Sequence, residues 1–222
     1  AARRFVIPTE AGLPPSPGDG YELKQVVDGV SSAPRPLFVS EPPGKNGFSM
    51  TTNRDPEDDH VYLSGPAISD RSSAFILVTN LDKEGFPQRS AQAEADGRFG
   101  PIAMPGKHGD RMVIEVIGDN ESRYDVMAPL DRRRTRSSYT DGGTGRATGS
   151  PGSARPGAEI EVRVPRRGRT FRTTADEHGA FDLEFIVGAG ETILLTQSKT
   201  SDDGSAVYES PPIRLESPKE AE

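Results

Sequence analysis

Residues 158–185 read AEIEVRVPRRGRTFRTTADEHGAFDLEF, and this stretch predicts a strand, a tight turn and a returning strand. Ala158 to Val164 alternate apolar with charged side chains, and because successive side chains of a strand point to opposite faces, the alternation predicts a half-buried strand. We expect Asp176 to accept hydrogen bonds from the backbone N–H groups that follow it, and Gly179 to supply the positive φ that a tight turn needs. Phe181 then returns the chain to the core.

The same pattern occurs earlier in the chain, in the same order and at nearly constant spacing. The matching segments are Gly65 with Gly149, Ala74–Val78 with Ala158–Val162, Ala95-Asp96 with Ala175-Asp176, Gly97–Phe99 with Gly179–Phe181, Met112–Val116 with Thr192–Thr196, and Tyr124-Asp125 with Tyr208-Glu209. On this alignment the second copy has two additional residues, Glu177 and His178, which predict a longer turn. A repeated series of short strands separated by turn signals predicts two antiparallel sandwiches.

Residues 149–185 resemble a bacterial immunoglobulin-like (Big-type) repeat of the kind found along surface adhesins. The resemblance rests on Gly149, on Pro156-Gly157-Ala158, on the strand Ile160 to Val164 and on Thr173 to Phe181. Residues 93–118 are similar but looser, and their turn, Asp96 to Phe99, also resembles the carboxypeptidase regulatory-like sandwich. The resemblance implies an immunoglobulin-like fold, an exported bacterial setting and a spacer, adhesion or docking role, but it names no ligand.

We therefore expect an all-β chain with two tandem immunoglobulin-like antiparallel β-sandwiches behind an extended, Pro-rich N-terminal arm. Proline fixes φ and lacks an N–H, so the arm is predicted to be extended, with Leu23 to Val30 and Leu37 to Val39 as strand candidates. The polar segment DRRRTRSSYTDGGTG predicts a linker. The expected ranges are 1–57 for the arm, 58–130 for the first sandwich, 131–145 for the linker, 146–217 for the second sandwich and 218–222 for a frayed tail.

Composition excludes several classes of function. The 222 residues carry a net charge of −7, so the chain repels phosphate and nucleic acid is not expected as a partner. The absence of Cys excludes disulfides, thiolate metal sites and thiol nucleophiles. No apolar run approaches the roughly 18–20 residues that span a bilayer, so no membrane span is expected.

Candidate catalytic and metal-binding motifs are weak. His60, His108 and His178 lie far apart in the sequence and lack zinc-site spacing. Acidic clusters at 55–59 and 202–203 suit calcium chemically, but without a recognised loop pattern solvated loops are favoured. The segment GGTGRATG, residues 142–149, lacks the strand, lysine and helix of a phosphate loop. We therefore predict no catalytic residue, no cofactor and no metal.

Arginines form the sharpest charge feature. Arg132, Arg133, Arg134 and Arg136 follow one another closely, and a second basic stretch contains Arg166, Arg167, Arg169 and Arg172. Guanidinium groups bind carboxylates, anionic lipids and polyanions. A solvated linker that balances nearby acids is the simpler interpretation, and docking of a protein partner by Arg132, Arg133, Arg134 and Arg136 is the leading alternative.

These observations favour a non-catalytic structural or docking protein over an enzyme. We expect an accessory or scaffold subunit outside the cytoplasm, in the periplasm or at the cell surface of a bacterium, which binds another protein of an envelope or surface assembly. A surface adhesin or a carbohydrate-binding module is the alternative. Carbohydrate sites usually present exposed aromatic rings, and this chain has no Trp and only 5 Tyr.

Overall fold

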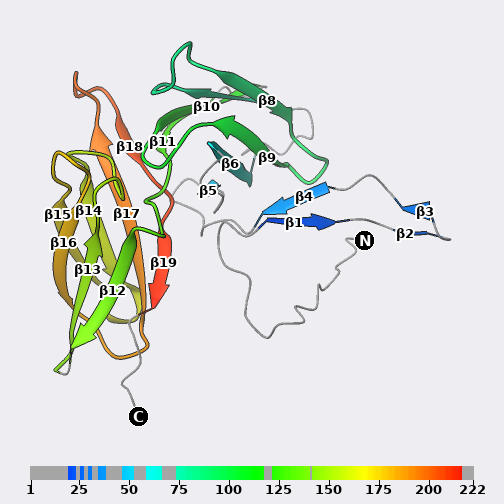
Figure 1. The fold of residues 1–222 in the computed structure, drawn as a ribbon. Helices are drawn as coiled ribbons and strands as arrows, with labels where there is room; N and C mark the ends of the chain where they lie inside the picture. The colour runs from blue at the N-terminus through cyan, green and yellow to red at the C-terminus, as the bar shows by residue number, and fades with distance from the viewer. Residues whose placement is uncertain are drawn as a thin grey trace.

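A computed structural model of the chain describes residues 20–23, 26–27, 30–31, 35–38, 47–52, 59–66, 74–117, 122–140 and 142–216. Within these ranges the regular secondary structure is almost entirely β-strand, and the single helical element described is a short 3-10 turn, η1 (Pro165–Arg167). The prediction of an all-β chain is confirmed. Figure 1 shows two β-sandwiches side by side, with a separate ribbon of strands from the N-terminal part of the chain.

The first sandwich consists of a three-stranded and a four-stranded layer. The smaller layer has the order β5 (Ser49–Thr52), β6 (His60–Pro66) and β9 (Arg98–Pro105). The larger layer has the order β8 (Gln88–Gln92), β7 (Phe75–Asn80), β10 (Arg111–Ile117) and β11 (Ser122–Met127). All of these pairs are antiparallel.

The second sandwich repeats this arrangement. Its smaller layer has the order β12 (Thr135–Thr140), β13 (Thr144–Gly149) and β16 (Phe181–Ile186). Its larger layer has the order β15 (Arg169–Thr174), β14 (Glu159–Val164) and β17 (Thr192–Thr200). The last strand is divided into β18 (Val207–Glu209) and β19 (Ile213–Glu216), which pair with opposite ends of β17.

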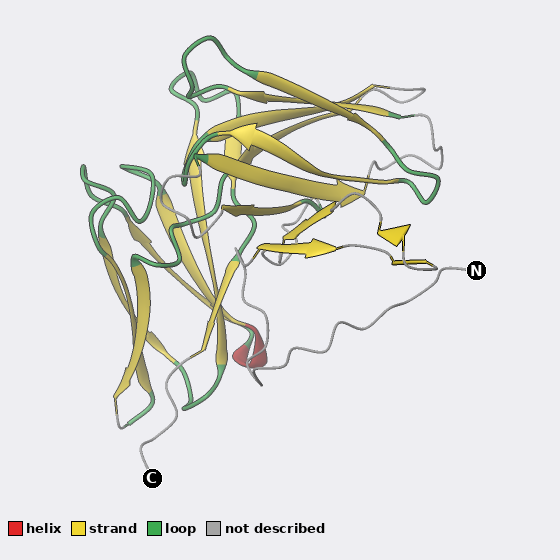
Figure 2. Cartoon of the chain, turned by 45° about the vertical axis from the view of Figure 1, so that its right-hand side comes forward, coloured by secondary structure: helices red, strands yellow, loops and turns green. Residues whose placement is uncertain are grey.

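One sheet passes from the first sandwich into the second. β11 pairs in parallel with β18 through Val126 and Glu209, and this joins the two larger layers into a nine-stranded sheet. Figure 2 shows the two sandwiches next to each other from a second direction. A continuous sheet ties the orientation of one sandwich to that of the other.

Each sandwich has its own hydrophobic core, made of the inward-facing residues of both layers. Along β14 the burial alternates, with Ile160, Val162 and Val164 fully buried, so the period of two in the sequence is confirmed. Gly65 and Gly149 occupy equivalent places, because each pairs with the first aromatic residue of the neighbouring strand. A Cβ at Gly149 would lie 2.3 Å from the ring of Phe181, so the site requires glycine.

The predicted linker is wrong. Residues 135–140 form β12 and residues 144–149 form β13, and both strands belong to the second sandwich. The glycines of this segment make room for aromatic rings: a Cβ at Gly145 would lie 2.7 Å from the ring of Phe185. A composition typical of linkers arises here because close packing requires small residues.

The boundary of the N-terminal arm also needs correction. β5 lies within the predicted arm, yet Phe48 and Met50 are buried in the first core, so the first sandwich begins by residue 48 and not at 58. Further upstream, β1 (Gly20–Leu23) pairs with β4 (Arg35–Phe38), and β2 (Val26–Val27) pairs with β3 (Val30–Ser31). The rest of the predicted extended arm, and the predicted tail at 218–222, lie outside the described residues.

The internal repeat is real, but three of the proposed matches have the wrong register. Ala93, and not Ala95, corresponds to Ala175, because each donates its N–H to the alanine carbonyl that precedes the adjacent strand. The turns that follow, 94–98 and 176–180, are closed by equivalent hydrogen bonds and have equal length, so the predicted longer second turn is wrong.

The other two register errors concern the match of β10 with β17 and the match of β11 with β18. Met112 corresponds in burial and pairing to Ile193 and not to Thr192, because a shift of one residue exchanges the core and solvent faces of a strand. Tyr124 packs against the first core, whereas Tyr208 lies at the junction of the sandwiches beneath the guanidinium of Arg111. The two tyrosines are therefore not equivalent.

Candidate functional site at the junction of the two sandwiches

The segment that connects β11 to β12 is hydrogen-bonded to both sandwiches. Ala128 donates its N–H to Asp110 in the first sandwich, and its carbonyl accepts a 2.8 Å hydrogen bond from the Gln197 side chain in the second. Asp131 donates its N–H to Ser153, and Leu130 is buried in the second core. The connection therefore has little freedom to bend.

Asp82 is the electrostatic centre of the junction. Its carboxylate accepts hydrogen bonds from Arg111 of the first sandwich, at 2.8 Å from Nη2, and from Arg155 of the second, at 2.5 Å from Nη1. The same Nη1 of Arg155 also donates to the carbonyl of Gly109, at 3.0 Å. One carboxylate thus holds a guanidinium group from each sandwich.

The charge state of Asp82 follows from this geometry. Burial by itself would raise the pKa of Asp82, but the hydrogen bonds from Arg111 and Arg155 outweigh burial and lower the pKa to about 2. Arg111 in turn lies over the ring of Tyr208, with 5.6 Å between the guanidinium carbon and the ring centroid, a cation–π contact. Asp82 therefore remains ionised over the physiological pH range.

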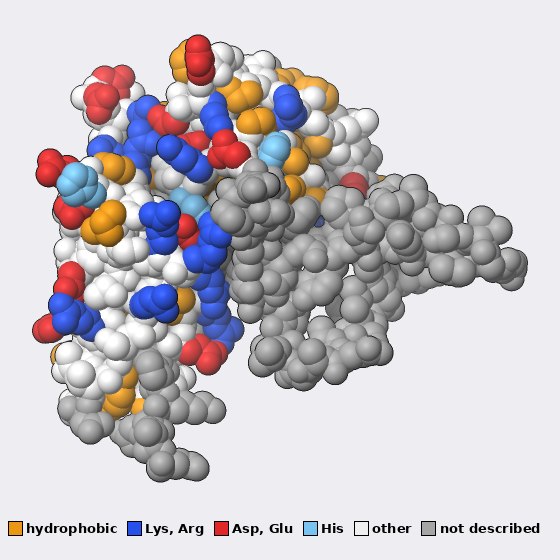
Figure 3. All heavy atoms as spheres, in the orientation of Figure 1, with side chains coloured by type: hydrophobic (Ala, Val, Ile, Leu, Met, Phe, Trp, Pro, Cys, Tyr) orange, Lys and Arg blue, Asp and Glu red, His pale blue; other side chains and the backbone are white. Residues whose placement is uncertain are grey.

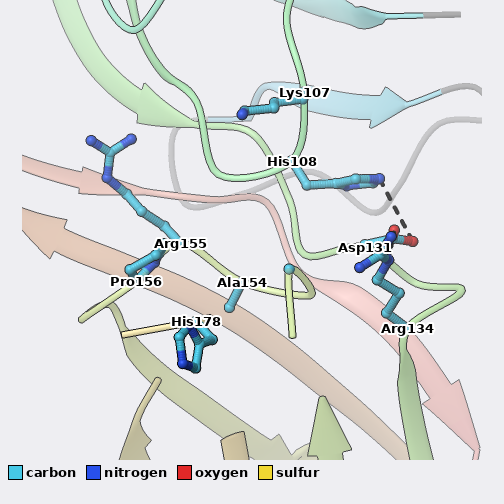
Figure 4. Close-up of a pocket in the computed structure, with 9 residues that line it drawn as sticks. Lys107, His108, Asp131, Arg134, Ala154, Arg155, Pro156 and His178 are labelled. Carbon is cyan, nitrogen blue, oxygen red and sulfur yellow. Dashed lines mark ion pairs between the residues drawn. The ribbon is translucent and has the colours of Figure 1, made fainter. Parts of the chain in front are cut away.

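A cleft of about 430 Å³ lies at the junction, and its lining includes Lys107, His108, Asp131, Arg134, Arg155 and His178. Figure 4 shows that these side chains do not converge: His108 points toward Asp131, while Lys107 and Arg155 extend to the other side. His178, whose ring lies apart from that of His108, comes from the turn before β16. The cleft offers positive charge at its rim, and the lining residues form no acid–base pair around one reacting atom.

His108 lines this cleft and is held by the first sandwich and by the segment that connects β11 to β12. Its Nδ1 lies 3.2 Å from the carbonyl of Pro129, and its Nε2 lies 3.1 Å from the hydroxyl of Thr52. Burial lowers the pKa of His108, against the opposing effect of the Asp131 carboxylate, and the charges of Arg133 and Arg134 lower it further. The fold therefore favours the neutral imidazole.

This environment predicts a loss of stability in mild acid. The pKa of His108 is lower in the folded chain than its ordinary value of 6.5, so below that pH the unfolded chain binds a proton that the folded chain resists. Stability from this group is present above pH 6.5 and is lost as the pH falls. Urea unfolding at pH 7.5 and pH 5.5 should show a smaller drop for His108→Gln than for the unmodified chain, and equal drops would contradict this role.

Of the four arginines of the predicted docking site, Arg134 lines this cleft. Arg132 to Arg134 form the turn that precedes β12, and Arg136 lies exposed on β12. Asp131, whose side chain is 6% exposed, pairs with Arg133 at 3.6 Å and with Arg134 at 3.5 Å. Among the described residues, no ion pair involves Arg132 or Arg136.

The other candidate features have structural roles. Arg166 and Arg167 pair with Glu191, and Arg172 pairs with Glu161, so most of the second basic stretch is balanced by acids. Asp203 accepts hydrogen bonds from Ser201 and Ser205 in the turn between β17 and β18, and these bonds lower its pKa to about 2. The acidic residues 55–58 lie outside the described residues.

No group of three or more His, Cys, Asp or Glu side chains suited to a metal ion occurs in the described part of the chain, and His60, His108 and His178 are not brought together. In that part, no helix has the length and apolar character needed to cross a bilayer.

Asp82 and Arg155 were not foreseen from the sequence. They are separated by 73 residues and come from loops whose proximity depends on how the sandwiches pack. Asp82 follows directly after the strand Phe75–Asn80 in a polar loop, and charged loop residues usually indicate only solvent exposure. No local sequence signal distinguishes this aspartate from its neighbours.

No family model matches the chain, and no curated protein matches it. Similar solved structures include the chicken interferon gamma receptor alpha chain, with 11% identity, a TM-score of 0.28, and coverage of 80% of this chain and 98% of that one. A two-domain fibronectin type-III segment of chicken tenascin has 13% identity, a TM-score of 0.28, and coverage of 75% and 95%. A bacterial ice-binding adhesin has 12% identity, a TM-score of 0.27, and coverage of 73% and 58%, so this chain spans little more than half of that one. The strand order and the two cores make this chain an all-β protein with two immunoglobulin-like sandwiches.

Proposed function

We propose that this chain is a non-catalytic scaffold and docking protein that works outside the cytoplasm, as an accessory subunit of an envelope or cell-surface assembly. Its two sandwiches act as one rigid body that presents a fixed surface to a protein partner. The observation that supports this proposal is the junction, where one sheet and one carboxylate connect both sandwiches.

The physical basis is that separate domains in one chain move relative to each other unless their interface constrains them. At this junction three kinds of constraint coincide: the parallel pairing of β11 with β18, the hydrogen bond from Gln197 to Ala128, and the ion pairs of Asp82. Two sandwiches held this way keep a constant separation, which is what a spacer or scaffold requires.

The cleft supports docking better than catalysis. Catalysis by a proton-transfer pair requires two groups within hydrogen-bond reach of one reacting atom. In the junction cleft, Arg155 is instead engaged in holding the sandwiches together, and Arg134 lies at the rim. A surface of this kind is suited to binding a partner, and we assign the docking role to Arg132, Arg133, Arg134 and Arg136.

Spin-label distance measurement tests the rigid scaffold. The chain has no Cys, so Ser90→Cys on β8 and Thr170→Cys on β15 introduce the only two thiols, at exposed positions on opposite edges of the nine-stranded sheet. We expect one narrow distance distribution in the doubly labelled chain, and a broader one when Arg155→Ala is added. A broad distribution without Arg155→Ala would refute a fixed orientation, and with it the proposed scaffold.

A further inference from the structure

We propose that the arginine turn, which we define as Arg132–Arg134 together with the neighbouring Arg136, forms a binding site with the adjacent cleft. The ligand of this site is a short acidic segment of a protein partner, rich in Asp and Glu. This inference rests on the proposed docking function and names the chemistry of the partner. It begins from a comparison of how arginines are balanced across the described surface.

Most arginines of the second sandwich have an acidic partner close by. Arg146 pairs with Asp182, Arg214 with Glu216, and Arg163 with Glu161 at 3.0 Å. The arginine of the junction loop, Arg155, pairs with Asp82. On this sandwich a guanidinium group beside a carboxylate is the usual arrangement.

The arginine turn departs from this pattern. The cations in it and beside it are Lys107, Arg132, Arg133, Arg134 and Arg136, and the acids described beside them are Asp110 and Asp131. Asp110 is 4% exposed and is already hydrogen-bonded to Asn80 and to the Lys107 N–H. Among the described residues, this leaves more cations than acids around the turn, and Arg132 and Arg136 take part in no described ion pair. Figure 3 shows Lys and Arg side chains gathered over the junction on this face.

The exposed groups are able to reach a ligand. Arg134 has 56% of its side chain exposed and lines the cleft together with Lys107. Its Nη1 is anchored at 2.6 Å on the carbonyl of Pro151, and this anchor holds the guanidinium group at the rim. An arginine whose position is fixed loses less conformational entropy when it binds a carboxylate, and a guanidinium group can hold both oxygens of that carboxylate.

The size and the setting of the patch favour a short peptide over an extended polyanion or a membrane. The chain as a whole has a net charge of −7, so a long polyanion or an anionic bilayer that met this patch would also meet the acidic remainder of the surface. A cluster of a few carboxylates on a peptide can occupy the patch alone. The cleft of about 430 Å³ beside the turn accommodates one or two of its side chains.

Fluorescence anisotropy with a labelled hexaglutamate peptide tests the site. We expect the intact chain to bind the peptide at low ionic strength, with affinity falling as salt is added, because the contacts are charge pairs near the surface. The double variant Arg132→Gln/Arg136→Gln should lose at least tenfold in affinity. These two residues have no ion pair in the described structure, so their replacement should leave the thermal midpoint unchanged.

The matched control is Arg89→Gln/Arg169→Gln, which removes the same charge from two exposed arginines on edge strands far from the turn. Equal losses for the two double variants would mean that only net charge matters and would overturn the site. Binding of phosphatidylglycerol vesicles or dextran sulfate through Arg132 and Arg136, in place of the peptide, would overturn the acidic-peptide assignment. Because the spin-label experiment needs no ligand, the scaffold can stand even where the peptide site fails.

Discussion

Gly179→Ala is expected to lower the free energy of unfolding by about 4 kcal/mol, the largest effect of any single change considered for this chain. Gly179 has φ +75°, and a Cβ at this position would lie 2.1 Å from the carbonyl oxygen of Ala154, a backbone atom that cannot rotate away. The loop 152–154 would have to move as a unit.

That movement would break a set of buried hydrogen bonds. The Gly179 carbonyl accepts hydrogen bonds from the Ala154 N–H at 3.1 Å and from the Ser153 hydroxyl at 3.0 Å. Ser153 is fully buried, so its hydroxyl would be left without a partner, at a cost of about 1–3 kcal/mol. Left-handed strain at a residue with a Cβ adds roughly 1–2 kcal/mol.

Gly168→Ala measures the cost of backbone strain without a steric clash of the added Cβ. Gly168 has φ +60° but nothing within 4 Å of its missing Cβ, so only the strain applies and a loss of about 1 kcal/mol is expected. Denaturant unfolding of both variants measures the difference. Equal losses would show that the contact with Ala154 has no special weight.

Asp82→Ala is the second large effect, with an expected loss of about 2 kcal/mol at neutral pH. The pKa of Asp82 falls from 3.8 to about 2, and each unit corresponds to about 1.4 kcal/mol, before a reduction for solvent screening at this surface loop. The substitution would also leave Arg111 and Arg155 facing each other without their shared acid.

The dependence on pH provides a second test of the same pair. A carboxyl group with a lowered folded pKa stabilises the fold above its ordinary pKa and loses that contribution as the pH falls from about 4 toward 2. The variant should lack this part of the acid sensitivity. Asp182→Ala is the control, because its ion pair with Arg146 is half exposed and screened by water, so its loss should destabilise the fold much less than the loss of Asp82. A loss for Asp182→Ala as large as that for Asp82→Ala would contradict the central role of the junction.

Local sequence chemistry predicted much of the second sandwich. Alternation in 158–164 and the Asp-Gly turn before Phe181 depend on neighbours close in the chain, and both occur as predicted: Asp176 accepts hydrogen bonds from the N–H groups of His178 and Ala180. Register errors arose where the pattern itself was ambiguous. By residue type, either Ala93 or Ala95 can be aligned with Ala175, and only the hydrogen bond from Ala93 to Ala74 decides between them.

By itself, the sequence determined the class of fold, the presence of two related units and the turns that punctuate them, because strand periodicity and turn conformation are properties of adjacent residues. Tertiary structure alone decided that Gly145 and Gly149 belong to strands beneath aromatic rings, and that Asp82 joins arginines of two sandwiches. These outcomes depend on which distant segments come into contact when the cores form. The local sequence around a glycine or a charged residue does not indicate which distant residue it will contact.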